Sequence, residues 1–151
     1  MAGYWNMPQA DAEAVRDGWL HTGDLGKVDA RGNITFVDRL KDIVISGGLN
    51  ISAAEVERAI AMCDGVEEVA VIAAEDKVFG ETPLAIVHGD IARIDIPSII
   101  AHCDTILANY KVPRYMVLSA EPLPRLTSGK ISKIALRETW ADASARLPKV
   151  R

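Results

Sequence analysis

Strand-like and helix-like segments alternate along most of the chain after Lys41, and this order limits the fold more than any other feature. Ser52 followed by Glu55 forms a capping box that predicts a helix over residues 53–62. Asp95 caps a second helix that ends at Asn109, and a third is predicted over residues 132–141. Short apolar, strand-like runs lie between them, at residues 43–45, 66–74, 84–88 and 115–118. The resulting order, βαββαβα, predicts an α+β domain with a small sheet of about three strands flanked by helices.

The first 38 residues have a different character. Residues 1–18 mix turn formers with a short helical stretch at 10–16 and are interpreted as a connector. Residues 19–28 and 34–38 are two β-capable runs around a loop of Asp, Gly and Asn, which predicts a β-hairpin. A two-stranded hairpin is marginal in water, so its apolar residues are expected to need a partner surface outside the chain or a second copy of it.

Composition excludes several classes of protein. The chain has 151 residues, of which 49% are apolar and 25% charged, as in an ordinary globular protein that needs no disulfide. Its longest apolar run, residues 69–74, is too short to cross a membrane, and no signal-peptide pattern opens the chain. Cys63 and Cys103 show no disulfide or zinc pattern, which favours a reducing, cytoplasmic location.

The formal net charge of −4 is unevenly distributed. Residues 1–100 carry 8 Lys and Arg against 17 Asp and Glu, a balance of −9, whereas residues 101–151 carry 9 against 4, a balance of +5. The basic segment lacks the aromatic interleaving of a nucleic-acid site, so nucleic acid is not expected as a partner. It favours a small phosphorylated ligand or a merely solvated basic face.

The loop at residues 124–130 offers hydroxyls, a flexible glycine and the Lys130 ammonium in one turn. It suits a phosphate, although it lacks the first Gly and the Ser or Thr after Lys that a P-loop requires. Taken alone, the loop is more simply explained as an ordinary solvated turn before a helix. His21, His88 and His102 have spacings that indicate neither a metal site nor a catalytic triad.

Other polar positions are ambiguous when taken singly. Ser46, Gly47 and Gly48 follow a strand, where paired glycines permit close approach of a ligand but more often form a turn. Asp24 lies in a β segment, and Arg39 and Lys41 lie in a mixed-charge joint between two β segments. Each of these has an ordinary explanation as a surface group.

Taken in order, these segments resemble the C-terminal part of the adenylate-forming superfamily, in particular its AMP-forming acyl-CoA synthetases. Residues 18–25 (GWLHTGDL) are similar to the ribose-binding segment and residues 37–42 (VDRLKD) to the hinge between the large and small domains. Residues 45–51 with 55–57 are similar to the segment that follows the hinge, and residues 124–130 to the loop that bears the adenylation lysine. Residues 109–114, between them, also resemble the family.

This resemblance implies a ligase that converts a carboxylate to acyl-AMP with ATP and Mg²⁺ and then to acyl-CoA with coenzyme A. It assigns adenylation to Lys130, nucleotide binding to Asp24 and Arg39, and the hinge to Lys41. It places the pantetheine tunnel at Gly47, with Ser46 and Gly48 beside it. Carrier-protein enzymes of the superfamily often have Arg-Gly-x-Arg at this position, so the Gly-rich form here favours CoA.

The superfamily's phosphate loop, adenine pocket and acyl pocket have no counterpart in this sequence. The chain is therefore interpreted as residues 1–38 from the tail of a large N-terminal domain, a hinge at 39–41, a small domain at 42–142 and a flexible tail at 143–151. Its expected partners are its own N-terminal domain, a small carboxylic acid and CoA, with self-association through the hairpin as a further possibility. The alternative is a non-catalytic, stand-alone binding or regulatory module with the same fold.

Overall fold

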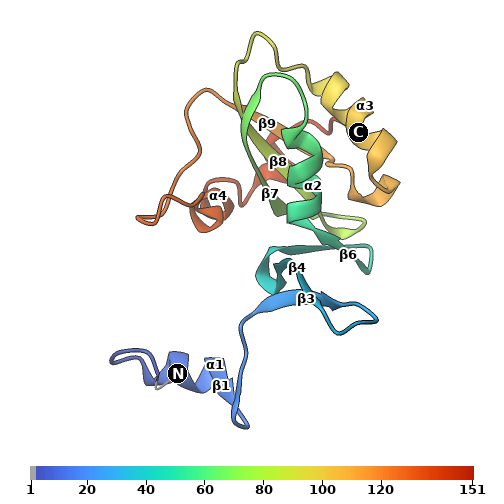
Figure 1. The fold of residues 1–151 in the computed structure, drawn as a ribbon. Helices are drawn as coiled ribbons and strands as arrows, with labels where there is room; N and C mark the ends of the chain where they lie inside the picture. Colours follow the sequence, from blue (N-terminus) through green and yellow to red (C-terminus); the bar gives the residue numbers. More distant parts are fainter. Residues whose placement is uncertain (1–2) are drawn as a thin grey trace. The chain divides into compact units, whose positions relative to one another are not determined.

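The structure is a computed structural model that describes residues 3–151. The chain folds into two compact units that meet in sequence between Lys41 and Asp42 (Figure 1). The 3₁₀ turn η1 (Leu40–Asp42) contains this boundary. No helix among the described residues is long and apolar enough to cross a membrane.

The first unit is built from small antiparallel ladders. Helix α1 (Pro8–Ala14) is followed by β1 (Val15–Arg16), which pairs with β2 (Trp19–Leu20). Strands β3 (Asp24–Val28) and β4 (Ile34–Arg39) form the second ladder. The predicted hairpin is thus confirmed for β3 and β4, whereas the Trp19 segment belongs to a separate ladder because it pairs back onto residues 15 and 16.

Large apolar side chains of this hairpin unit are exposed. Trp19 is 76% exposed, Ile34 77% and Phe36 59%. Exposed apolar side chains gathered on two-stranded ladders leave little to hold such a unit together in water. This matches the expectation that the hairpin lacks part of its cover.

The second unit contains one sheet of five strands, with the order β6-β5-β8-β7 and β9 paired in parallel with β8. Its strands are β5 (Ile43–Ser46), β6 (Leu49–Ser52), β7 (Val66–Asp76), β8 (Gly80–Gly89) and β9 (Tyr115–Ser119). The α+β prediction is confirmed, but the sheet is larger than the expected three strands. Strand β6 was missed because Gly47-Gly48 was interpreted as the end of a strand, when it is the turn of a hairpin.

Helices cover both faces of this sheet (Figure 1). On one face, Val71 and Val87 pack with residues of α2 (Ala53–Ala61) and α3 (Ile96–Ile106). On the other, Ile72 and Ile86 pack with residues of α4 (Lys133–Thr139) and α5 (Ala143–Arg146). Successive strand residues point to opposite faces, which explains why β7 and β8 are apolar at nearly every central position.

The predicted helix starts are confirmed by their caps. The Ser52 hydroxyl accepts a hydrogen bond from the Glu55 N–H at 3.2 Å, and the Asp95 carboxylate accepts one from the Ser98 N–H at 2.9 Å. The hydroxyl and amide of Ser98 together lower the pKa of Asp95. Helix α3 ends at Ile106, before Asn109, which instead starts the 3₁₀ turn η2 (Asn109–Lys111).

The C-terminal tail packs against the sheet instead of being flexible. Ala143 is 1% exposed, and the Val150 N–H donates to the Arg114 carbonyl at 2.9 Å. Lys149 forms an ion pair of 2.8 Å with Asp76, whose side chain is 1% exposed. The prediction of a free tail was wrong because these contacts join residues more than 30 positions apart, which no local pattern shows.

Candidate active site

Lys130 lies at the end of an exposed loop whose backbone is nevertheless well tied. The Leu126 N–H donates to the Lys130 carbonyl at 2.8 Å, and the Gly129 N–H donates to the Leu126 carbonyl at 2.8 Å. A bridge between Arg125 and Ile131 closes the loop at its base. The Lys130 ammonium makes no ion pair or hydrogen bond within residues 3–151, so the loop presents a free cation on a defined backbone.

The start of this loop is attached to the sheet through Glu68 of β7. One carboxylate oxygen of Glu68 accepts the Leu123 N–H at 2.8 Å, and the other pairs with the Arg125 guanidinium. Arg125 also donates to the Gly129 carbonyl at 2.6 Å. The Leu123 hydrogen bond, with Arg125, lowers the pKa of Glu68 and so favours its charged form.

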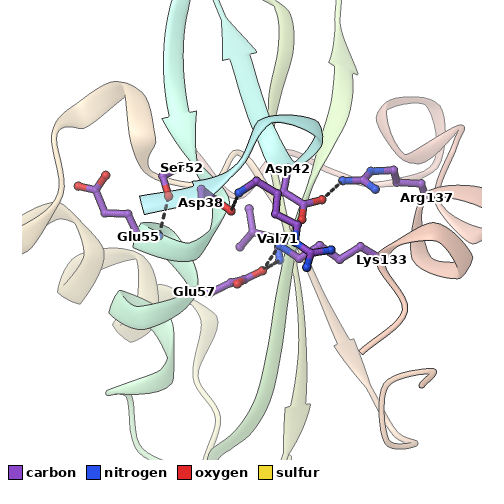
Figure 2. A network of polar contacts seen from close by, with 9 residues as sticks. Asp38, Asp42, Ser52, Glu55, Glu57, Val71, Lys133 and Arg137 are labelled. Atoms are coloured by element: carbon purple, nitrogen blue, oxygen red, sulfur yellow. Dashed lines mark hydrogen bonds and ion pairs between the residues drawn. The ribbon is translucent and has the colours of Figure 1, made fainter. Parts of the chain in front are cut away.

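The end of the loop is attached through helix α4. The Ser132 hydroxyl caps this helix by accepting the Ala135 N–H at 3.3 Å. Figure 2 shows Lys133 directed toward Glu57 of α2, and Arg137 directed toward Asp42 at the start of the unit. Both ends of the Lys130 loop are thus fixed by ion pairs, of which the Lys133–Glu57 pair is the more buried.

Gly47 and Gly48 form the two-residue turn between β5 and β6. Ser46 pairs with Leu49 across the turn, and the two glycines have φ of +56° and +81°. This two-residue, left-handed turn suits glycine because it matches the twist of the flanking strands without a Cβ clash. Ser46 itself is 6% exposed and also bridges Gly80 of β8.

Phe79 lies directly behind this turn. Its carbonyl accepts the Gly47 N–H at 2.8 Å, and its ring carbon would lie 3.1 Å from a Cβ placed on Gly47. The Arg114 guanidinium stacks on the Phe79 ring, 4.2 Å from the ring centroid. A Cβ on Gly48 would meet nothing within 4 Å. Gly47 is therefore the tight position of the pair and Gly48 the open one.

Asp76 fixes the loop that carries Phe79. Its carboxylate accepts the N–H groups of Val78 and Phe79 at 2.9 and 3.1 Å and pairs with Lys149. Lys149 is the largest influence and, with the two backbone donors, lowers the pKa of Asp76 to about 2. The buried carboxylate is charged at neutral pH and holds this three-residue connection in one conformation.

The predicted nucleotide residues lie together in the first unit. Asp24 and Arg39 face each other across the β3–β4 ladder, with 3.7 Å between the Arg39 Nε and an Asp24 carboxylate oxygen. Both side chains are about half exposed. Asp24 also borders a hollow of about 490 Å³ lined by the polar side chains of Glu13, Arg16, His21 and Thr22. An aspartate beside a polar hollow can accept hydrogen bonds from two vicinal hydroxyls.

The structure thus groups the predicted site residues in three places. Asp24 and Arg39 form one group, Ser46 with Gly47 and Gly48 a second, and Lys130 stands on a third. Sequence reasoning missed Phe79, Asp76, Glu57 and Lys133, which support the second and third groups. Among the described residues, no three His, Cys, Asp or Glu side chains gather in a way that could hold a metal ion.

Comparison with known proteins identifies the family of this chain. The family model described as the AMP-binding enzyme C-terminal domain matches residues 55–130. The chain is 45% identical over 146 residues to the long-chain-fatty-acid–CoA ligase FadD13 of Mycobacterium tuberculosis, covering 97% of this chain and 28% of the ligase. It is 47% identical over 141 residues to a feruloyl-CoA synthase of Amycolatopsis, covering 93% of this chain and 28% of that enzyme.

A solved structure shows the same fold. The o-succinylbenzoate CoA synthetase MenE of Bacillus subtilis, in complex with its acyl-adenylate intermediate, is 36% identical and superimposes with a TM-score of 0.84. The match covers 91% of this chain and 28% of the synthetase. The chain belongs to the family of AMP-binding enzyme C-terminal domains. It spans little more than a quarter of the length of these relatives.

Proposed function

We propose that this chain is the C-terminal part of an AMP-forming acyl-CoA synthetase and works in both of its half-reactions. The observation that carries the proposal is the Lys130 ammonium, which is exposed and unpaired within residues 3–151 on a loop tied at both ends. Of the four other lysines of the same unit, Lys111, Lys133 and Lys149 are paired with carboxylates, whereas Lys77 in the β7–β8 connection is exposed like Lys130. A cation kept free at a fixed position suits an anionic transition state supplied by another part of the enzyme.

In the first half-reaction, a carboxylate oxygen of the acid attacks the α-phosphorus of ATP, and the bond to pyrophosphate breaks. Negative charge builds on the phosphate oxygens and the leaving group as the bonds exchange in line. The Lys130 ammonium would stabilise this charge, while Asp24 accepts hydrogen bonds from the ribose hydroxyls and Arg39 faces the nucleotide. The magnesium ion that accompanies ATP would be held mainly by the N-terminal domain.

In the second half-reaction, the CoA sulfur attacks the acyl carbonyl, AMP leaves and the thiol proton is released. The Gly47 turn would border the passage for the pantetheine arm. The passage needs a residue without a side chain at this point, because Phe79 already lies 3.1 Å from where a Cβ would stand. Rotation of the small domain at residues 39–41, with Lys41 as the pivot, would exchange the Lys130 loop for the Gly47 turn at the reaction centre.

The acid that is activated is set elsewhere in the enzyme. Relatives that are 45% and 47% identical to this chain are named for a long-chain fatty acid and for ferulate, which differ greatly in shape. The same small domain therefore accompanies different acyl pockets. The proposed partners are the enzyme's own N-terminal domain, a carboxylic acid, ATP and CoA, in the cytoplasm.

The alternative of a non-catalytic module with this fold is less well supported. Such a module would have no need of an unpaired lysine on a braced loop or of a sterically tight glycine turn. Self-association through the exposed hairpin would cover Trp19, Ile34 and Phe36, but the N-terminal domain of the same polypeptide explains their exposure equally well.

The test compares this chain alone with an assembled ligase, meaning the natural full-length polypeptide or this chain joined to the N-terminal part of the mycobacterial relative. We expect carboxylate-dependent exchange of pyrophosphate into ATP, and CoA thioester formation, from the assembled ligase only. Exchange by the isolated chain above background would contradict the proposal, as would an assembled ligase that folds and binds ATP but forms no acyl-AMP.

A further inference from the structure

Helix α4 begins three residues after Lys130, so contacts that fix its first turn also fix the end of the loop. The first residue of this helix, Lys133, places its ammonium 2.6 Å from a carboxylate oxygen of Glu57 (Figure 2). The two side chains are only 18% and 22% exposed. A partly buried ion pair of this kind is held more firmly than an exposed one, because solvent competes with it less.

Glu57 is itself fixed by the backbone of the sheet. The same carboxylate oxygen that pairs with Lys133 accepts the Val71 N–H at 2.8 Å. Val71 belongs to β7, the last strand in the sheet order, so its outward N–H has no neighbouring strand to bond. Glu57 satisfies this edge amide, as a charged acceptor at an unpaired edge should. Through Glu57, the backbone of β7 therefore fixes the position of Lys133.

The pair also joins the two layers of helices. Glu57 belongs to α2 on one face of the sheet and Lys133 to α4 on the other, so the contact closes around the edge of β7. One helical turn further along α4, Arg137 pairs with Asp42 at 2.5 Å, which ties the same side of the helix to the residue next to Lys41. The Lys130 loop is therefore held to the part of the unit nearest the proposed hinge.

From these contacts we infer that Lys133, held by Glu57, is a positioning residue for Lys130 in the adenylation step. The inference rests on the proposed function of Lys130. Catalysis by a preorganised charge depends on its placement, and an error of about 1 Å can cost up to about 10²-fold in rate. The Gly47 turn is built by β5, β6 and Phe79 and uses neither member of the pair. Loss of the pair should therefore slow adenylation and leave thioester formation nearly unchanged.

The test uses the assembled ligase and measures the two half-reactions separately, as pyrophosphate exchange and as thioester formation from supplied acyl-AMP. Lys133→Met keeps most of the apolar stem and removes the charge. We expect it to slow adenylation by about tenfold, while thioester formation changes by less than about twofold. Lys133→Arg keeps the cation and should restore most of the adenylation rate.

Glu57→Gln provides a second variant, because its amide oxygen can still accept the Val71 N–H while the charge is lost. It should reproduce the selective defect, and the double variant with Lys133→Met should be little worse than either single variant, as expected for two residues that act as one pair. Arg93→Met, which removes the exposed ion pair with Asp64, is the matched control and should leave both half-reactions unchanged.

Equal loss of both half-reactions in Lys133→Met and Glu57→Gln would make the pair merely structural and overturn the inference, as would no loss in either. Failure of the proposed function has a different signature. It would appear as normal adenylation in Lys130→Ala, whatever the Lys133 variants do.

Discussion

The Lys130 loop and the Gly47 turn are both exposed, yet they are held in opposite ways. Charged side chains brace the loop, through Arg125 with Glu68 and Lys133 with Glu57. Backbone conformation and a single aromatic ring define the turn, through two positive φ angles and the contact with Phe79. The Lys130 loop, which presents a charge, is thus held by charged side chains. The Gly47 turn, which leaves space, depends on the absence of a side chain.

This contrast indicates how each site should respond to change. The loop should lose function when its cation, or a charge that positions it, is removed, whereas the turn should tolerate changes of charge but lose function when it is filled. The predictions below use this difference, in the assembled ligase unless stated otherwise.

The largest effect is expected for Lys130→Ala. Removal of one preorganised electrostatic group should slow acyl-AMP formation by about 10²–10³-fold. Pyrophosphate exchange measures this step directly. Lys27→Ala, which removes an exposed lysine from β3, is the control and should exchange at the normal rate. A Lys130→Ala rate within about twofold of normal would remove this residue from the reaction.

Gly47→Trp should block the second half-reaction while leaving adenylation largely intact. The indole would occupy the passage next to Phe79, and thioester formation should fall by about 10²-fold, as for loss of a productive approach geometry. Gly48→Ala separates steric filling from backbone strain, because its Cβ would meet nothing within 4 Å although φ is +81°. Equal damage by the two variants would assign the effect to strain and not to a blocked passage.

Lys41→Pro tests the hinge. Proline fixes φ near −65°, so a pivot that must change its backbone angles should turn less readily. We expect enzyme-bound acyl-AMP to accumulate and overall turnover to fall by about tenfold, with Lys41→Ala much less affected. Quenched-flow measurement of bound acyl-AMP reports the accumulation, and normal turnover would rule out Lys41 as the pivot.

The smallest expected effect concerns stability and pH, and it can be measured on the 151-residue chain. Asp76 has its pKa lowered to about 2 in the fold, below the ordinary value of 3.8. A lowered carboxylate pKa contributes stability that is complete above about pH 5 and is lost as pH falls through about 2, here about 2 kcal/mol. Urea unfolding of Asp76→Asn should therefore differ from that of the natural chain at pH 7 and converge with it near pH 2. A constant difference across this range would exclude the ionised carboxylate as the cause.

Local signals in the sequence predicted much of the fold. The caps at Ser52 and Asp95 place two helices, since a side chain that satisfies the first free amides marks a helix start within one residue. Strand β6 could also have been predicted, because two glycines between apolar runs are a hairpin signal. The flexible tail was a wrong prediction, since its packing depends on Asp76 and Arg114, which lie far away in the sequence.

In the candidate site, too, local sequence signals predicted some residues but not the distant residues that support them. Gly47 and Lys130 lie in short segments with a distinctive order, so they could be proposed from the sequence. Their supports could not, because Glu57 and Lys133 are 76 positions apart and the charges of both residues look like those of any solvated helix face. Only the fold shows that one carboxylate oxygen meets both an edge amide and the first residue of α4.

The central claim is that one small domain serves two half-reactions from two separate places. Thioester formation by the Lys130→Ala ligase, given acyl-AMP and CoA, tests it most directly. We predict that this variant forms the thioester at close to the normal rate although its formation of acyl-AMP is slowed by about 10²–10³-fold, and that Gly47→Trp shows the reverse. Failure of Lys130→Ala to transfer the acyl group would mean that the lysine supports the whole domain, and the division of labour between loop and turn would be contradicted.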